Sequence, residues 1–361
     1  MRLFKILTPD EAALAPLHPD DVLLWDDEQG RGVCDEVSVT NLRDPAVVGP
    51  GDVVRLREGS SLVSVLYRRG SAANVLFITE QCNSRCLMCS QPPRDEDDRW
   101  RTNELLDLIP LIDGNEVQLG VTGGEPTLHP EGLLGVLEQC ELYLPDAHLH
   151  VLTNGRQFRD RDLAERLVDA AGDRATWAVP LYADNPWRHD EIVDAEGAFE
   201  ETLQGLAELA RLGARVEIRV VLHALSIPRL VPLSDLIWRR LPFVEHVALM
   251  GLEPMGLAKS NRERLWVDPA DYAEPLEIAT RRLADRGMKV SIYNLPLCVL
   301  PQSVWPYARQ SISDWKNKLL PCCEPCLVKD KCAGFFESAG EAWRSRDISP
   351  ILVQEFADEL A

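Results

Sequence analysis

The sequence predicts an α/β protein built on one large parallel sheet that curls into a barrel or part-barrel. The chain has 361 residues, which suits one large α/β domain with smaller appended parts. From Ala73 onward, short β-branched runs alternate with amphipathic stretches of helical length, the pattern of repeated βα units. Cysteine-rich and glycine-rich motifs follow the first two of these runs, and parallel sheets bind ligands at the carboxyl ends of their strands.

Composition narrows the class of protein. Lys and Arg number 38 against 58 Asp and Glu, and a net charge of −20 argues against a nucleic-acid partner. Hydrophobic residues at 45% and 25 scattered prolines indicate a chain that folds throughout. No apolar run approaches the roughly 18 residues that span a bilayer, and Pro9 follows the first apolar residues too early for a signal peptide. We therefore expect a cytoplasmic protein without membrane contact.

Residues 1–70 predict a small β-rich N-terminal domain. Apolar runs at 21–25, 53–56 and 62–67 are separated by Gly, Pro and Asp, as in short strands joined by turns. Residues 71–290 then form the predicted barrel domain, and residues 291–361 form a cysteine-rich accessory domain with a last helical stretch near Val353–Leu360.

Six strands and six helices alternate in the barrel domain, and a further strand is expected at Lys289–Tyr293. The six strands are expected at Val75–Thr79, Val117–Thr122, Leu149–Thr153, Thr176–Ala183, Val216–His223 and Val247–Leu252. The six helices are expected at Glu104–Ile112, Glu131–Tyr143, Asp162–Ala171, Ala198–Leu212, Leu233–Leu241 and Asp271–Arg286.

Three cysteines, Cys82, Cys86 and Cys89, follow the first strand with the spacing C-x3-C-x2-C. Three thiolates in one loop can bind three irons of a four-iron cluster, and the lack of a nearby fourth cysteine leaves one iron open to an exogenous ligand. A zinc site completed by a distant residue and a set of inert buried thiols are the alternatives.

This cysteine loop resembles the hallmark of the radical S-adenosylmethionine (SAM) superfamily, and the resemblance covers residues 73 to about 295. It implies a (βα)6 partial TIM barrel in which Cys82, Cys86 and Cys89 hold a [4Fe-4S] cluster whose open iron chelates SAM. Met88 stands where the family usually has an aromatic residue, which affects packing beside the adenine rather than ligation.

Further SAM-binding residues are expected at the ends of later strands. Thr122–Thr127 looks like the GGEP motif of the family, so the resemblance assigns the SAM amino group to this turn. Asn154 can contact ligand or simply form a turn, Tyr182 and Asp184 are candidate ribose contacts, and Arg219 pairs either with the SAM carboxylate or with an acid such as Glu217. The expected cofactor-binding residues are Gly123, Gly124, Glu125, Pro126, Asn154, Tyr182, Asp184 and Arg219.

A second cysteine set lies near the C-terminus. It supplies four thiolates, with Cys322 as the alternative to Cys323, which suit a tetrahedral zinc site or a second four-iron cluster. Similar tails in peptide-modifying radical SAM enzymes carry an auxiliary [4Fe-4S] cluster, so the resemblance favours iron and sulfur. Cys34 and Cys140 are expected to be ordinary buried thiols. The expected ligands are Cys298, Cys323, Cys326 and Cys332.

The stretch 79–93, the strand at 249–256 and the cysteine-rich tail together look like the C-type radical SAM maturase of the His-Xaa-Ser peptide system. This resemblance implies reductive cleavage of SAM and abstraction of a hydrogen atom from a peptide or protein with His-Xaa-Ser repeats. Its implied partners are a second radical SAM maturase and an electron donor such as flavodoxin or ferredoxin. The alternatives are a radical SAM enzyme that acts on a small molecule and a non-catalytic metal-binding scaffold.

Overall fold

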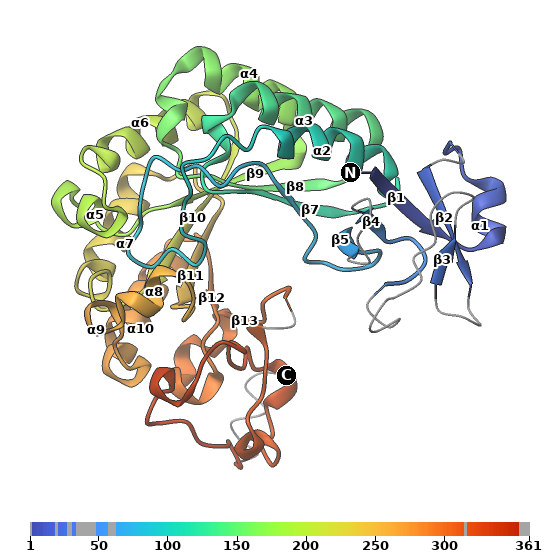
Figure 1. Cartoon of the computed structure of the whole chain (residues 1–361). Helices are drawn as coiled ribbons and strands as arrows, with labels where there is room; N and C mark the ends of the chain where they lie inside the picture. The colour runs from blue at the N-terminus through green and yellow to red at the C-terminus, as the bar shows by residue number, and fades with distance from the viewer. Residues whose placement is uncertain are drawn as a thin grey trace.

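Two β-sheets organise the chain in the computed structural model, which describes residues 2–18, 21–26, 31–33, 48–56, 63–313 and 316–353. Figure 1 shows the larger sheet as an arc with helices on its outer side, the small N-terminal sheet to the right and the C-terminal segment below. The predicted α/β class with a part-barrel core is confirmed, whereas the division into three domains at residues 70 and 290 stays a prediction.

The N-terminal sheet has five strands in the order β3-β2-β1-β4-β5. Phe4, Ile6, Leu23 and Val54 form its buried core. The predicted strands are present as β2, β4 and β5, whereas β1, α1 and β3 were not predicted. Strand β1 carries Arg and Lys among its apolar residues, and α1 and β3 are too short to show a period. Its elements are β1 (Arg2–Leu7), α1 (Pro9–Leu14), β2 (Val22–Asp26), β3 (Arg31–Val33), β4 (Val53–Leu56) and β5 (Val63–Tyr67).

The larger sheet has eight strands, all parallel, in sequence order from β6 to β13. The strand predicted to reach Ala183 ends at Pro180, since proline has no amide hydrogen to continue the ladder. The strands are β6 (Val75–Phe77), β7 (Gln118–Thr122), β8 (His148–Leu152), β9 (Ala175–Pro180), β10 (Arg215–Leu222), β11 (His246–Gly251), β12 (Lys289–Tyr293) and β13 (Ala308–Arg309).

Helices follow the strands at all six predicted places. The first begins earlier than predicted, at Trp100, and also ends earlier, at Leu108, because Pro110 has no amide hydrogen to continue the helix. Three short helices were missed, since each is too short to show a helical period: α5 (Pro186–Val193), α8 (Leu257–Ser260) and α9 (Arg262–Leu265). The six predicted helices are α2 (Trp100–Leu108), α3 (Pro130–Tyr143), α4 (Arg161–Ala171), α6 (Ala198–Arg211), α7 (Leu230–Arg240) and α10 (Ala273–Ala284).

Alternation along the strands separates two environments. Leu119, Val151 and Ile218 are fully buried in the main hydrophobic core, which also contains residues of the helices. The neighbouring positions on these strands, such as His150 and Arg219, are only partly buried and lie on the opposite face. The inner face of the arc is therefore partly polar, and it is this face that meets the candidate site.

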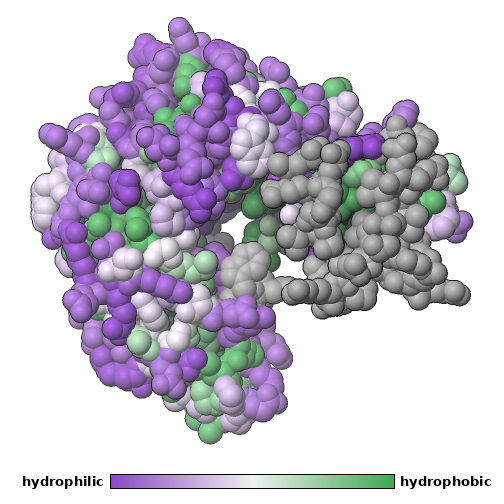
Figure 2. All heavy atoms as spheres, in the orientation of Figure 1, coloured by the Kyte–Doolittle hydropathy of each residue, from purple (hydrophilic) through white to green (hydrophobic). Residues whose placement is uncertain are grey.

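The C-terminal segment lies beside the later strands of the barrel. It consists mainly of short turns, and a β-bridge joins Lys318 to Phe335. Most of the helical stretch predicted at Val353–Leu360 lies outside the described residues. Hydrophilic residues predominate among the coloured residues of the face shown in Figure 2. Within the described ranges no helix is long and apolar enough to cross a membrane.

Candidate active site

A cavity of about 350 Å³ lies at the carboxyl ends of the strands, where the parallel topology predicts a ligand site. All three cysteines of the first cluster line it, together with residues that follow β7, β8, β9 and β11. Among the residues that line it are Cys82, Cys86, Cys89, Gly123, Gly124, Asn154, Tyr182, Arg219, Glu253, Asn294 and Lys316.

The cysteine loop is held by backbone hydrogen bonds to elements distant in sequence. The amide of Leu87 donates to the carbonyl of Ile192 at 2.9 Å, which joins the loop to α5. The amide of Leu257 donates to the carbonyl of Cys89 at 2.8 Å, and Asn261 donates from its side chain to the carbonyl of Leu87. The segment after β11 therefore holds the cysteine loop through two hydrogen bonds.

The three thiols lie near enough to influence one another. Burial raises the pKa of Cys82 to about 11, and burial together with the charges of Cys89 and Cys82 raises the pKa of Cys86 further. The charge of Arg156 opposes both shifts, and its Nη1 donates to the carbonyl of Asn83 at 2.5 Å. Metal ions displace protons from such thiols, so the cysteines would bind a metal cluster in their thiolate form.

Gly123 and Gly124 allow two backbones to approach closely. A Cβ atom on Gly124 would lie 2.3 Å from the carbonyl oxygen of Gln81, and one on Gly123 would lie 2.7 Å from that of Thr79. The amide of Gly124 donates to the Thr79 carbonyl at 2.6 Å, and the amide of Glu125 donates to the Gln81 carbonyl at 2.7 Å. The glycine turn therefore supports the segment that leads into Cys82.

Glu125 lies behind the wall of the cavity rather than in it. Its side chain is fully buried, and its two oxygens accept hydrogen bonds from the hydroxyls of Thr127 and Thr153 and from the amides of Thr127 and Asn154. Pro126 is buried as well. In this arrangement Glu125 joins the turn after β7 to the turn after β8, and its contact with SAM stays a prediction.

Three of the other predicted SAM contacts line the cavity, and a fourth, Asp184, does not. Asn154, Tyr182 and Arg219 line the cavity, and the Asn154 side chain donates to Asn83 Oδ1 at 2.6 Å. Asp184 is not among the lining residues and accepts hydrogen bonds from Arg229 at 2.6 and 2.7 Å. The ribose contact of Asp184 thus stays a prediction, whereas Asn154 supports the cysteine loop directly.

Sequence reasoning missed several residues of the site. Arg156 follows the Thr-Asn-Gly turn after β8, and Glu253 follows β11, so their positions at strand ends are the signal that could have found them. Lys316 comes from the C-terminal segment and forms an ion pair with Glu253 at 3.3 Å. No pattern in the sequence marks Lys316, because its place depends on how the C-terminal segment folds back.

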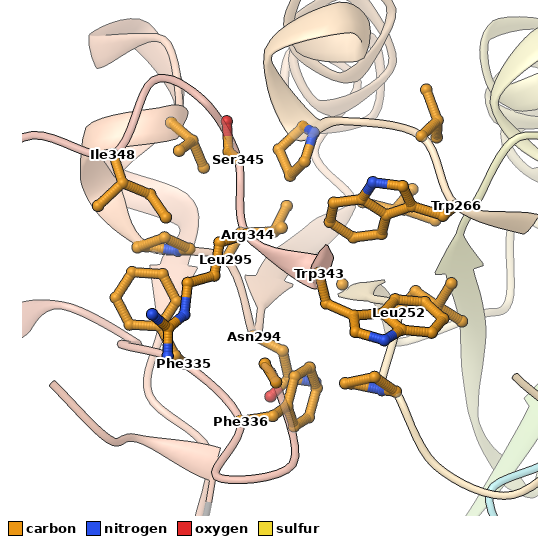
Figure 3. Close-up of a pocket in the computed structure, with 18 of the residues that line it drawn as sticks. Leu252, Trp266, Asn294, Leu295, Phe335, Phe336, Trp343, Arg344, Ser345 and Ile348 are labelled. Carbon is orange, nitrogen blue, oxygen red and sulfur yellow. The ribbon is translucent and has the colours of Figure 1, made fainter. Parts of the chain in front are cut away.

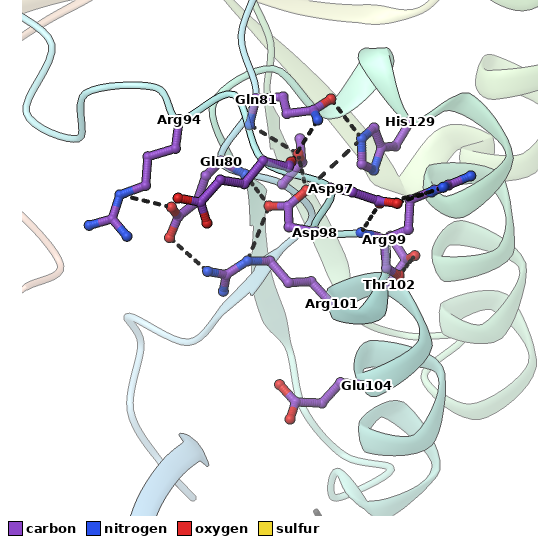
Figure 4. Close-up of polar contacts among 12 residues, drawn as sticks. Glu80, Gln81, Arg94, Asp97, Asp98, Arg99, Arg101, Thr102, Glu104 and His129 are labelled. Atoms are coloured by element: carbon purple, nitrogen blue, oxygen red, sulfur yellow. Dashed lines mark hydrogen bonds and ion pairs between the residues drawn. The ribbon is translucent and has the colours of Figure 1, made fainter.

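Asp98 connects the strand before the cysteine loop to the start of α2 (Figure 4). Its carboxylate accepts hydrogen bonds from the Thr79 hydroxyl at 2.7 Å, the Glu80 amide at 2.6 Å and Arg101 Nε at 3.2 Å. Its side chain is only 7% exposed, and Arg101 also forms an ion pair with Glu80 at 2.7 Å. The entry to the loop is therefore fixed by a buried charged network.

We expect Asp98→Asn to weaken the attachment of the loop. The amide offers one acceptor oxygen in place of two, and an unsatisfied buried donor costs about 1–3 kcal/mol. Thermal unfolding should shift to lower temperature and less iron should be bound after reconstitution. Asp97→Asn is the matched control, because the Asp97 side chain is 63% exposed and pairs with Arg99. Equal stability and iron content in both variants would contradict the role given to Asp98.

A second, smaller cavity of about 40 Å³ lies between the barrel and the C-terminal segment (Figure 3). Trp266 and Trp343 meet edge to face across it with ring centroids 5.5 Å apart, and Phe335 and Phe336 complete its apolar wall. It has room for about one water molecule. Because Leu252 lines both cavities, the C-terminal segment packs directly against the wall of the larger one.

Charge interactions link several cysteines of the second set, whose role as ligands of one cluster stays a prediction. The charges of Cys332 and Cys323 both act on Cys298, whose pKa is raised to about 11 mainly by burial, and the charge of Cys326 acts on Cys332. The amide of Leu297 donates to the Cys332 sulfur at 3.4 Å. Cys322 is exposed and Cys323 is partly buried, which favours Cys323 in the set.

The two remaining cysteines lie away from both sets or outside the described residues. Cys140 is buried in α3 as predicted, and Cys34 lies outside the described residues. In the described part of the chain, no three His, Cys, Asp or Glu side chains are placed to hold one metal ion. A four-iron cluster is bound differently, because each cysteine binds its own iron atom and the sulfurs stay apart.

The first cysteine set fits a four-iron cluster with bound SAM. Three soft thiolate donors come from one loop on one wall of a cavity, and the closely packed glycine turn stands beside them. The cavity also falls within the size range of small-molecule sites.

Comparisons with known proteins agree with this fit. Residues 76–227 match the model of the Radical SAM superfamily. The chain is similar to the GTP 3′,8-cyclase of Nautilia profundicola, with 28% identity over 149 residues that cover 40% of this chain and 45% of the relative. It is also similar to the AdoMet-dependent heme synthase of Methanosarcina barkeri, with 26% identity over 202 residues that cover 54% of each chain. The chain spans about half the length of these curated relatives.

Among solved structures, the chain is similar to the histidine-tagged form of anSMEcpe with bound AdoMet. The TM-score is 0.50 at 13% identity, and the match covers 79% of this chain and 91% of that one, which concerns the fold alone. The cysteine loop and the strands from β7 to β10 all lie within the matched residues 76–227, so the likeness to the radical SAM superfamily covers the part of the chain that carries the candidate site.

Proposed function

We propose that this chain is a radical SAM enzyme that abstracts a hydrogen atom from a peptide or protein, in the maturation of a polypeptide with His-Xaa-Ser repeats. The observation that supports enzyme chemistry most strongly is that Cys82, Cys86 and Cys89 share one cavity with Gly124 and Asn154. When held by these cysteines, a reduced [4Fe-4S] cluster with an open iron would supply the one electron that cleaves SAM to methionine and a 5′-deoxyadenosyl radical.

The residues of the chain hold and enclose the reactants in this proposal. Cys82, Cys86 and Cys89 are the ligands, and Asn154 and Arg156 support their loop from β8. Tyr182, which is 7% exposed, contributes an apolar ring to the wall. Lys316 and Glu253 form the side of the cavity toward the C-terminal segment, where a substrate can approach. Enclosure of this kind limits side reactions of a radical.

Two substrate classes remain, and each has its own support. The peptide class rests on the resemblance to the His-Xaa-Ser maturase and on the second cysteine set, which would be an auxiliary cluster. The small-molecule class rests on the curated relatives, two of which act on GTP or in heme synthesis by their names. If the substrate is a peptide, the proposed partners are a second radical SAM maturase and an electron donor such as flavodoxin or ferredoxin.

Deuterium transfer into 5′-deoxyadenosine separates the two classes. Anaerobically reconstituted protein with dithionite and SAM is given either deuterated His-Xaa-Ser repeat peptide or deuterated GTP. The proposal predicts deuterium in 5′-deoxyadenosine with the peptide and none with GTP. Transfer from GTP alone would establish the small-molecule class, and an absence of 5′-deoxyadenosine under all conditions would favour a non-catalytic scaffold.

An iron and sulfide count tests the auxiliary cluster. Two four-iron clusters give about eight irons per chain, and Cys332→Ser should lower the number to about four while SAM binding persists. About four irons together with one zinc in the wild-type protein would instead assign zinc to the second set, which would remove any redox role for it.

A further inference from the structure

A group of polar side chains lies on the inner face of the sheet, below the strand ends that carry the cysteine loop. They come from four strands, β8, β10, β11 and β12, and the register of β10 and β11 places Glu217 opposite His246. Barrel interiors are usually filled by branched apolar side chains, so a polar group here needs an explanation. We call this group the floor network: His150, Glu217, Arg219, His246 and Ser291.

The floor network fixes Arg219 through Glu217. Arg219 Nη1 donates to Glu217 Oε1 at 2.9 Å, and the other oxygen of Glu217 lies 2.7 Å from His246 Nδ1. His246 Nε2 in turn lies 2.9 Å from the hydroxyl of Ser291, and His150 Nε2 lies 3.4 Å from Glu217 Oε1. Each polar atom of Glu217 is therefore satisfied, and the side chain is 8% exposed.

The surroundings of the carboxylate at the centre of the network favour its charged form. Burial acts to raise the pKa of Glu217, but hydrogen bonds from His150 and His246 and the charge of Arg219 lower it well below its ordinary value. The 2.9 Å contact with the Glu217 carboxylate holds one side of the Arg219 guanidinium.

One edge of the Arg219 guanidinium is left for a ligand. Arg219 lines the cavity with its side chain 25% exposed, and its hydrogen bonds to described residues use only Nη1. The Nε and Nη2 hydrogens form a fork that matches the two oxygens of a carboxylate or phosphate. The side chain is thus built to receive an anionic group.

We infer that Arg219, oriented by Glu217 and His246, binds an anionic group of the substrate, a carboxylate or phosphate, at the floor of the cavity. This inference rests on the proposed function, because it needs a substrate in the same cavity. The SAM carboxylate is the other source of such a group. The substrate is favoured because Arg219 lies within β10, whereas the cysteine loop, Gly124 and Asn154 all follow strand ends.

Inorganic phosphate is the probe for this subsite. Its binding to reconstituted, SAM-loaded protein is measured by calorimetry, and SAM binding is measured separately on the same samples. Loss of a charged bidentate contact should raise the phosphate dissociation constant about tenfold or more in Arg219→Gln. Arg219→Lys keeps the positive charge but loses the two-pronged donor, so its phosphate dissociation constant should lie between those of Arg219→Gln and the wild type. The SAM affinity of both variants should stay within about twofold of the wild-type value.

Glu217→Gln tests the positioning role. The uncharged amide no longer holds the guanidinium, so phosphate binding should weaken severalfold with unchanged iron content. His148→Gln is the matched control, because His148 also faces the inner side of β8 but contacts Thr176 rather than Arg219. It should bind phosphate like the wild-type protein.

Three results would overturn the inference. One is the absence of millimolar phosphate binding to the wild-type protein, and another is equal binding to Arg219→Gln. The third is competition between phosphate and SAM with loss of SAM affinity in Arg219→Gln, which would assign Arg219 to the SAM carboxylate. Iron content and SAM cleavage of the wild-type protein report separately on the proposed function, so its failure is distinguishable from that of the subsite.

Discussion

Replacing Cys86 by alanine is expected to abolish reductive SAM cleavage. In this variant only Cys82 and Cys89 remain, and a second iron of the cluster has no protein ligand. The cluster should then not be held, so iron binding at this site should be lost together with the activity. We expect the release of 5′-deoxyadenosine to fall by about a hundredfold or more relative to the wild-type protein. It is measured by chromatography after incubation with dithionite and SAM, and the iron content is measured on the same preparation.

Cys140→Ala is the matched control for this variant. Cys140 is fully buried in α3, inside the main hydrophobic core, and does not line the cavity. Its loss removes a small buried group and leaves the cysteine loop unchanged, so SAM cleavage should continue at the wild-type rate. Wild-type activity in Cys86→Ala would refute the cluster, whereas loss of activity in both variants would point to misfolding.

Gly124→Ala is expected to have the second-largest effect. The added methyl group would lie 2.3 Å from the carbonyl oxygen of Gln81, and this oxygen belongs to the backbone that leads into Cys82. Relief requires the two backbones to separate, which breaks the hydrogen bond from the Glu125 amide to Gln81. Overpacking of this kind costs about 1–3 kcal/mol or more. Thermal unfolding should shift downward, and most of the bound iron should be lost.

Gly135→Ala provides the comparison at a permissive site. Gly135 lies in α3, and a Cβ atom there would meet the Leu106 side chain at an ordinary distance of 3.5 Å. Alanine also favours the helix by about 0.5–1 kcal/mol, so this variant should be as stable as the wild type or more stable. If Gly124→Ala behaved in the same way, the close approach at the glycine turn would not matter for the loop.

The alternation of strands and helices could be predicted from the sequence because the six longer helices and most strands of the barrel are long enough to show their period. The strand at Lys289–Tyr293 has the predicted bounds. Shorter or interrupted elements escaped: α5 has eight residues, and β1 carries charges at Arg2 and Lys5. The presence of a charged Lys5 in a buried strand makes sense only in the folded chain, where Lys5 forms an ion pair with Asp113 of the barrel at 2.5 Å.

The candidate site was predictable where its residues form local motifs. Cys82, Cys86 and Cys89 belong to one loop, and the glycine turn follows the next strand. Contacts between distant segments were not predictable, because spacing carries no information about them. The contacts of Asp98 and Lys316 are examples. The burial of Glu125 is another, since its oxygens accept hydrogen bonds from the turns after β7 and β8 and do not face the cavity.

The electron paramagnetic resonance spectrum of the reduced protein tests the central claim most directly. The measurement uses Cys298→Ser/Cys332→Ser protein, so that signals from the second cysteine set are removed. If Cys82, Cys86 and Cys89 hold a four-iron cluster with an open iron, the spectrum shows one such cluster and shifts when SAM is added, with about four irons per chain. A cluster spectrum that SAM leaves unchanged, or protein without iron, would contradict the account.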